Sequence, residues 1–516
     1  MSADAPDAPA RAPLVLAALV LAAVVCNINV ASATVALPEV GDAFGASQTL
    51  LNLVGVGTGL GLSISVLYLG ALADRYGRKQ LLILGLVLTV AASVIAAAAP
   101  SVEVLIAARV FTGIAAGMAY PTTLSLITAL WSPGPGRTAA IALWASVSGV
   151  ASVTGSVIAG LVLEVAWWGA AFLLAVPVAI AGLVLVIAVV PSHVNESSEP
   201  VDHAGGILSA LGIGSLVLGA NLALAPGEQA LGVLLLVASA LLLVGFVWRQ
   251  SRAPHPLFDL SVARQRPFWV PALSGAIAVG GLIGAIFVGE QFMQNVLGYD
   301  PMQAGFAVVP AAAGLLLMAP VSARLVDARG TRATMLVGYA CVLAAFVTML
   351  AWREGTSYAL VGAGFLALGA GAALVMTASS RSLTGITPVT RVGMASATSD
   401  LQSDLGGSLM SSVLGAILAA GFSRSFAAAI ESSSDAASIG DEVTRALQAS
   451  YASALHVAEQ YPQFKDEIIE AARASLQAGA IGAYAVGSTA IVIGAVLVVL
   501  VLPSHDDELA LVTTTR

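Results

Sequence analysis

The feature that most constrains this chain is a series of fourteen apolar runs, each long enough to cross a membrane. About 20 apolar residues in a helix span the roughly 30 Å hydrocarbon core, and a segment in lipid must pair its own backbone groups. The runs lie near residues 14–36, 51–72, 81–99, 104–127, 138–163, 168–190, 205–224, 230–248, 268–292, 303–325, 333–352, 358–378, 393–420 and 480–502. The sequence therefore predicts an all-α integral membrane protein with fourteen transmembrane helices.

Composition agrees with this fold class. Of the 516 residues, 58% are hydrophobic and 10% are charged, whereas soluble domains carry about 25% charged residues. Cys26 and Cys341 both lie inside apolar runs, so they indicate neither a disulfide framework nor a metal site. Half of the net charge of −8 comes from residues 421–479, where eight acidic residues oppose four basic ones. No basic stripe suited to nucleic acid is present, and we predict no cofactor.

The basic residues orient the spans, because cytoplasmic loops are enriched in Lys and Arg. With the N-terminus in the cytoplasm, the short outer loops hold only Arg353, so both termini are predicted to be cytoplasmic. The first run, preceded by Arg11 and containing Ala-Ser-Ala at residues 31–33, also resembles a signal peptide. Cleavage would leave an odd number of spans and reverse the charge pattern, so an uncleaved first span is favoured.

Two short loops repeat one pattern. The loop GALADRYGRK (residues 70–79) aligns without a gap with ARLVDARGTR (residues 323–332), which matches Asp74 to Asp327. The first loop joins the second and third of the opening six spans, and the second loop joins the second and third of the closing six. The chain is therefore predicted to contain two six-helix bundles of the same polarity, an arrangement typical of secondary transporters.

The predicted organisation follows from this repeat. It comprises a disordered cytoplasmic tail at 1–13, an N-terminal six-helix bundle at 14–190, a linker with two extra transmembrane helices at 191–267, a C-terminal six-helix bundle at 268–502 and a cytoplasmic tail at 503–516. The C-terminal bundle includes a long outer segment, 421–479, in which apolar residues at helical spacing predict two amphipathic helices. These helices extend the last two spans outward or lie on the membrane as a lid; a solvated connector is the alternative.

With these residues in view, the chain resembles the major facilitator superfamily along essentially its whole length. GALADRYGRKQLL (residues 70–82) matches that family's G-x-L-a-D-r-x-G-r-k loop, and Arg109 to Gly113 match its R-x-x-x-G pattern. The inserted pair, with VALPEV at 35–40 and QNVLGYDPMQAG at 294–305, is similar to the fourteen-helix drug:proton antiporter branch. Span five departs from the antiporter motif, with Ser156 where a Pro would stand.

This resemblance implies proton-coupled secondary active efflux of lipophilic compounds, cationic ones in particular, by alternating access. The implied partners are a small-molecule substrate, protons and the lipid bilayer, with no nucleic acid, and the implied form is a monomer in the bacterial inner membrane. One alternative is an exporter of an endogenous lipid or metabolite. The other is an integral-membrane enzyme, which the sequence disfavours because it has no nucleotide-binding loop or metal-ligand spacing and its five histidines lie outside the spans.

The resemblance also implies that the repeated loop is a cytoplasmic latch in the outward-facing state. The acid would sit against a helix terminus and basic partners of the other half, and a charge at a helix end contributes about 0.3–1 kcal/mol. The predicted latch residues are Asp74, Arg75, Gly77, Arg78, Asp327 and Gly330. For the basic members, the alternative is that they only anchor the topology.

Ionisable groups inside a bilayer are costly, so each marks a candidate functional position. Arg109 lies where the family places a residue implicated in proton coupling; the alternative is a structural brace. Asp400 and Asp404 share one helix face, and two carboxyl groups there cannot both ionise cheaply, so one should hold a proton. We predict that all three residues take part in proton coupling. The alternative places Asp400 in the interface and Asp404 on local backbone.

Three further polar residues are candidates for substrate binding. Glu290 lies near the outer third of span nine, at a position where the family usually carries an apolar or aromatic residue, and it either binds a cationic substrate or faces water. Asn27 and Asn29 lie in the middle of span one, and Asn29 stands where many members of the branch carry an acid.

Overall fold

The computed structural model describes residue 9 and residues 11–132, 135–192, 200–225, 227–385, 392–433 and 439–503. Within these ranges every regular element is a helix, and twelve helices are long and apolar enough to cross a membrane. The predicted all-α membrane fold class is therefore confirmed. Of the proposed tails, residues 1–8, 10 and 504–516 lie outside the described residues, and α1 already begins at Ala12 within the first tail.

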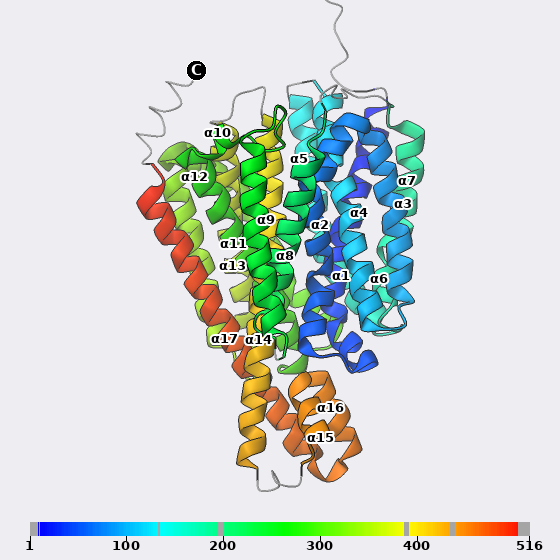
Figure 1. The fold of residues 1–516 in the computed structure, drawn as a ribbon, viewed down its shortest axis with the longest axis vertical. Helices are drawn as coiled ribbons and strands as arrows, with labels where there is room; N and C mark the ends of the chain where they lie inside the picture. The colour runs from blue at the N-terminus through cyan, green and yellow to red at the C-terminus, as the bar shows by residue number, and fades with distance from the viewer. Residues whose placement is uncertain are drawn as a thin grey trace, which may run out of the picture.

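The helices fall into a first group, a middle pair and a second group (Figure 1). The first group contains α1 (Ala12–Phe44), α2 (Gln48–Tyr76), α3 (Arg78–Ala97), α4 (Val102–Leu130), α5 (Pro135–Leu163), α6 (Ala170–Leu173) and α7 (Ala175–Val189). The middle pair is α8 (His203–Leu222) and α9 (Gln229–Gln250), followed by the short α10 (Leu260–Ala263). The second group contains α11 (Arg266–Asn295), α12 (Pro301–Leu350), α13 (Tyr358–Gly385), α14 (Val392–Ser432), α15 (Asp441–Ala449), α16 (Tyr451–Gln460), the 3₁₀ turn η3 (Pro462–Phe464) and α17 (Lys465–Val501).

The middle pair connects the two groups. Figure 1 shows α8 and α9 in green between the first group on the right and the second group on the left. α8 packs against α2 of the first group and α14 of the second, and α2 and α14 also pack against each other. The interface between the groups thus pairs α2 with α14, α5 with α12 and α1 with α11.

The two repeated loops are sharp turns at glycine. Gly77 separates α2 from α3 with φ 112°, and Gly330 interrupts α12 with φ 82° and ψ 171°. Residues with a Cβ atom rarely adopt a positive φ, whereas glycine does so readily, so glycine permits both turns. α2 begins next to α15 and α16 and runs away from them, so Gly77 at its far end lies opposite these helices. Gly330 is placed by Arg332, which donates to the carbonyl of Val499 near the end of α17, also opposite them. Both turns therefore lie at the same end of the molecule.

The opposite end carries a projecting structure that we call the cap. It consists of the described residues of 421–479, namely the end of α14, α15, α16, η3 and the start of α17 (bottom of Figure 1). The first predicted amphipathic helix is divided at Ser450, whose backbone is extended and whose hydroxyl caps α16 by accepting the Ser453 N–H at 3.1 Å. The second is the first part of α17, which continues into the apolar span.

Candidate functional site

Arg109 joins four helices inside the first group. It is 1% exposed, and its Nη2 donates to the carbonyl oxygen of Asn29 on α1 at 2.7 Å. Its guanidinium carbon lies 5.2 Å from the ring centroid of Phe172 on α6, a favourable cation–π distance. The hydroxyl of Thr58 on α2 donates to the Arg109 carbonyl at 3.2 Å. These contacts are the ones expected of a structural brace, in which Arg109 holds α1, α2 and α6 against α4.

The two asparagines of α1 also bond within the first group. The Asn29 side chain accepts from the hydroxyl of Ser93 on α3 at 3.3 Å and donates to the Val25 carbonyl at 3.0 Å. Asn27 is partly buried and donates to the Ala23 carbonyl at 3.0 Å. Asn29 therefore lies in the helix packing between α1 and α3, next to the contact with Arg109.

Glu290 lies on α11 and is completely buried. Neither of its carboxyl oxygens has a hydrogen-bond partner in the described part of the chain, and Thr34 of α1 is a polar neighbour across the interface. An ionised carboxylate in such a place would be an uncompensated buried charge, which is strongly destabilising. The arrangement therefore suits a protonated carboxyl group, and Glu290 does not face water in this conformation.

Beside Glu290, buried amides connect the two groups. Gln48 of α2 donates to the Asn52 side chain at 3.2 Å and to the side chain of Gln291 on α11. The exposed fractions of Gln48, Asn52 and Gln291 are 3%, 0% and 2%. Gln294 of α11 donates to the Val35 carbonyl of α1 at 3.3 Å. Sequence reasoning missed these contacts, although polar residues inside two apolar spans were an available signal.

Asp404 lies on α14 and is partly buried. It precedes Ser408 by four residues, so the two side chains lie on the same face of α14, the face that meets α2 of the first group. One turn further along α14, the hydroxyl of Ser408 lies 3.2 Å from that of Ser63 on α2. The side chain of Asp400 lies outside the described residues, so the predicted pairing of the two carboxyl groups stays a prediction.

The aspartates of the two repeated loops pair within their own groups. Arg78 Nε donates to Asp74 at 2.8 Å, and Arg78 Nη1 donates to the Ser125 carbonyl of α4 at 3.3 Å. In the second loop, Arg381 of α13 donates to Asp327 at 2.6 Å. Exposed ion pairs of this kind contribute about 0–1 kcal/mol.

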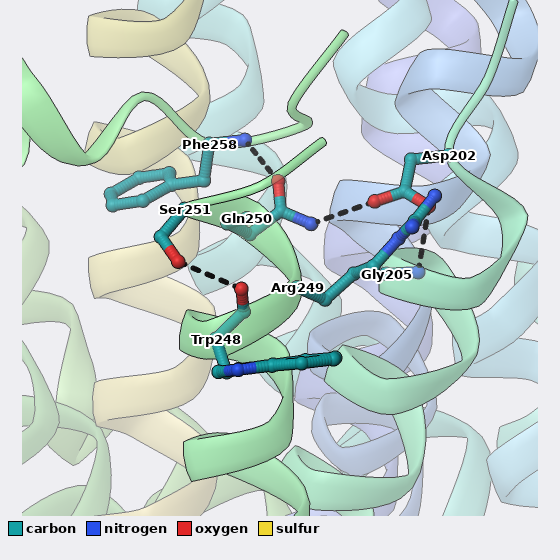
Figure 2. Close-up of polar contacts among 7 residues, drawn as sticks. All are labelled: Asp202, Gly205, Trp248, Arg249, Gln250, Ser251 and Phe258. Atoms are coloured by element: carbon teal, nitrogen blue, oxygen red, sulfur yellow. Dashed lines mark hydrogen bonds and ion pairs between the residues drawn. The ribbon is translucent and has the colours of Figure 1, made fainter. Parts of the chain in front are cut away.

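A polar cluster at the end of the middle pair was not predicted from the sequence. Asp202 caps α8 by accepting the Gly205 N–H at 3.1 Å, and it also accepts from Arg249 Nε and from Gln250 Nε2, both at 3.0 Å (Figure 2). The Gln250 carbonyl oxygen in turn accepts the Phe258 N–H at 3.1 Å. The cluster fixes the start of α8 against the end of α9 and orients the segment that follows.

The same region is attached to both groups. Tyr68 of α2 has its hydroxyl 2.8 Å from Nδ1 of His203, the first residue of α8. On the other side, the ring of Phe258 packs against that of Phe268 on α11 at 6.3 Å between centroids, in a small cluster with Leu383 of α13. The middle pair is thus a tether between the groups at the end opposite the cap.

The cap forms a second connection at its own end. The hydroxyl of Ser450, which is fully buried, donates to the Ala46 carbonyl in the turn between α1 and α2 at 2.8 Å. The hydroxyl of Ser453 donates to the neighbouring Gly45 carbonyl at 3.4 Å. Part of the second group is therefore docked on the first.

Known proteins resemble this chain in sequence. The Major Facilitator Superfamily matches residues 19–411. "Multidrug efflux pump LfrA" of Mycolicibacterium smegmatis is 32% identical over 76% of this chain and 78% of its own. "Multidrug resistance protein Stp" of Mycobacterium tuberculosis is 28% identical over 71% of this chain and 68% of its own. "Methyl viologen resistance protein SmvA" of Salmonella typhimurium is 30% identical over 74% of this chain and 78% of its own.

The fold also has a relative among crystal structures. A bacterial homolog to the human lysosomal transporter Spinster, in an inward-facing and unoccupied conformation, superposes with a TM-score of 0.62 at 16% identity, over 94% of this chain and 97% of its own. That likeness concerns the fold. Proteins of this type are transporters and not enzymes, which removes the enzyme alternative. From the family match, its coverage and the transporter relatives, this chain belongs to the major facilitator superfamily.

Proposed function

We propose that this protein is a proton-coupled exporter that removes lipophilic, cationic drugs or toxic compounds from a bacterial cell by alternating access. The names of its relatives support drug efflux as the activity, and one relative is named for resistance to the cation methyl viologen. The observation that carries the proposal is the position of Glu290 and Asp404 on helices of the second group. Glu290 is fully buried on α11, which bonds α1 through Gln294, and Asp404 lies on the face of α14 that meets α2 at Ser63. An acid there can exchange a proton for a cationic compound.

The proposed topology has fourteen spans in the inner membrane, with both termini cytoplasmic. α12 then supplies two spans separated by Gly330, and α5, a helix of 29 residues, supplies one. The middle pair would be the insertion at 191–267 between bundles at 14–190 and 268–502. The distribution of Arg and Lys in the loops supports placing the cap outside. The working unit in this proposal is a monomer.

We assign this conformation to the inward-facing state. Direct hydrogen bonds between the groups lie at the cap end, through Gln48 with Gln291 and Ser450 with Ala46, and midway along α2, through Ser63 with Ser408. At the opposite end Asp74 and Asp327 pair within their own groups. In the outward-facing state the cap-end contacts would break and the cytoplasmic latch would form across the groups. The proposed latch residues are Asp74, Arg75, Gly77, Arg78, Asp327 and Gly330.

The proposed coupling uses competition at a carboxyl group. Asp404, assisted by Asp400, would hold a proton or a cationic substrate, because a poorly solvated carboxylate is stabilised by either positive charge. Glu290, Asn27 and Asn29 are the proposed substrate-binding residues; Glu290 would become accessible only when the cap end opens. Arg109 would link the protonation state to the position of α1 through the Asn29 carbonyl.

The test uses purified protein in proteoliposomes with an imposed pH gradient and methyl viologen or tetraphenylphosphonium as substrate. We expect Asp404→Asn to abolish proton-driven efflux while the protein still reaches the membrane, because an amide cannot take up and release a proton as a carboxyl group does. Exchange of labelled for unlabelled substrate without a gradient should persist, and Asp404→Glu should restore coupling.

Two results would contradict the proposal. Undiminished proton-driven efflux by Asp404→Asn would remove Asp404 from the coupling mechanism. If the wild-type protein moved neither cation under any gradient, the assignment as an exporter of lipophilic cations would be wrong.

A further inference from the structure

The cap contains a pocket of about 170 Å³. It lies between α15 and α16 on one side and the ends of α14 and α17 on the other, away from the interface between the two groups (Figure 1). Most of its lining is apolar, including Leu447, Val457 and Ile468. An apolar cavity of about 150 Å³ accepts one benzene molecule, so this pocket has room for about one aromatic ring.

The remaining lining gives the pocket a preference for positive charge. Phe426, Tyr461 and Phe464 contribute aromatic rings, whose faces attract cations. Among the described lining residues Glu467 is the charged one; it is exposed, and the Ser433 hydroxyl donates to one of its carboxyl oxygens at 3.5 Å. Residues 421–479 as a whole carry eight acidic and four basic side chains. An apolar pocket with aromatic walls and a carboxylate at an exposed edge fits a cation attached to an aromatic ring.

We propose that this pocket is a second binding site for lipophilic aromatic cations, separate from the interface between the helix groups. This inference rests on the proposed function in two respects: the class of compound that reaches the pocket, and the position of the cap outside the cell. A compound released at the cap end would leave the membrane protein past this pocket, which offers its ring an apolar environment and its charge a carboxylate. The site would thus retain exported cations at the outer surface.

The test is photolabelling of the full-length protein in lipid nanodiscs without a pH gradient. The probe is (4-azidobenzyl)trimethylammonium, which carries one aromatic ring, and labelled peptides are identified by mass spectrometry. We expect label on the peptides that line the pocket. Leu447→Trp should reduce that label by about tenfold, because the indole would occupy the space that the ring of the probe needs. Glu467→Gln should reduce it by up to about fivefold, the scale of one exposed ion pair.

Matched controls separate the pocket from general effects. Glu470→Gln removes an exposed acid that does not line the pocket, three residues further along α17, and should leave the label unchanged. Replacement of the ammonium by a tert-butyl group gives a neutral probe of the same shape, which should label the pocket several-fold more weakly. Glu467 is exposed, so Glu467→Gln keeps the test valid if Leu447→Trp fails to fold.

The proposal is overturned if the neutral probe labels the pocket as strongly as the cation, or if neither Leu447→Trp nor Glu467→Gln changes the label. Binding is measured without transport, so the two proposals fail separately. Labelling of the pocket in a protein that transports no cation would support this site and contradict the exporter. Proton-driven efflux by a protein whose cap takes no label would support the exporter and contradict this site.

Discussion

The two ends of the interface between the helix groups are joined in different ways. At the cap end, buried neutral groups bond directly across it, as Gln48 does with Gln291 and Ser450 with Ala46. At the opposite end, the exposed Asp327 pairs with Arg381 of its own group, and the middle pair tethers the groups indirectly. A carrier that alternates needs two conformations of similar free energy. Several weak contacts at each end suit that requirement better than one strong contact.

The largest effect is expected from locking the cap end. A Cβ atom at Gly41 would lie 3.0 Å from Cβ of Ala452 on α16. Disulfides need about 3.5–4.5 Å between Cβ atoms, so a small outward shift of α16 brings the pair into bonding range. The double variant Gly41→Cys with Ala452→Cys should lose nearly all efflux on oxidation and regain it on reduction. The controls are the two variants that carry only one of these substitutions, Gly41→Cys or Ala452→Cys. Full transport by the crosslinked protein would mean that the cap need not leave α1.

The second prediction concerns the buried amides. Gln291→Leu removes one of the two acceptors of Gln48 Nε2 and leaves the bond to Asn52, and a buried N–H left unpaired costs about 1–3 kcal/mol. The population with an open cap end should rise by about fivefold to a hundredfold, since 1.4 kcal/mol is tenfold. A cysteine at Ala452, which is 7% exposed, should then react faster with an impermeant maleimide. Replacing Gln48 by Leu as well should recover part of the change; an unchanged rate in Gln291→Leu would show that the amides do not hold this end closed.

A smaller effect is expected at the tether. Asp202→Ala removes the cap of α8 together with the bonds to Arg249 and Gln250. The loss should lower the free energy of unfolding by about 1–2 kcal/mol, the range for a lost helix cap. Thermal unfolding of the purified protein measures this. Asp202→Asn keeps the capping oxygen and should recover part of the stability; equal stability of all three proteins would show that the cluster does not hold the middle pair.

The smallest effect is expected at the exposed loop pair. The side chains of Asp327 and Arg381 are 66% and 46% exposed, so Asp327→Asn should change the stability of this conformation by less than about 1 kcal/mol. The change should shrink further at high salt. A loss of several kcal/mol, independent of salt, would show that the pair is a structural lock at the end opposite the cap.

The sequence predicted the parts of this structure that depend on local pattern. Apolar runs predicted the membrane-spanning helices, and the repeated loop predicted turns at Gly77 and Gly330 that lie at the same end. The contact of Gln48 with Gln291 joins residues 243 positions apart, and that of Ser450 with Ala46 joins residues 404 apart. No local sequence pattern indicates which helices distant in the chain pack together, so these contacts could be identified only from the three-dimensional structure.

The candidate site was predictable to a similar extent. The cost of charge in lipid was enough to select Arg109, Glu290 and Asp404 from the sequence. It did not reveal that Arg109 bonds the Asn29 carbonyl or that Glu290 is sealed from water, because both follow from how α1 packs.

The central claim is that the two ends open in alternation, and paired spin-label distances test it most directly. One pair, at Glu164 and Arg353, spans the cap end; the other, at Tyr76 and Arg329, spans the opposite end, and all four residues are exposed. Both distances are measured by pulsed electron paramagnetic resonance in nanodiscs as substrate is added and pH is changed. The account predicts that the cap-end distance lengthens as the opposite distance shortens. Distances that lengthen together, or that both stay fixed while transport proceeds, would contradict it.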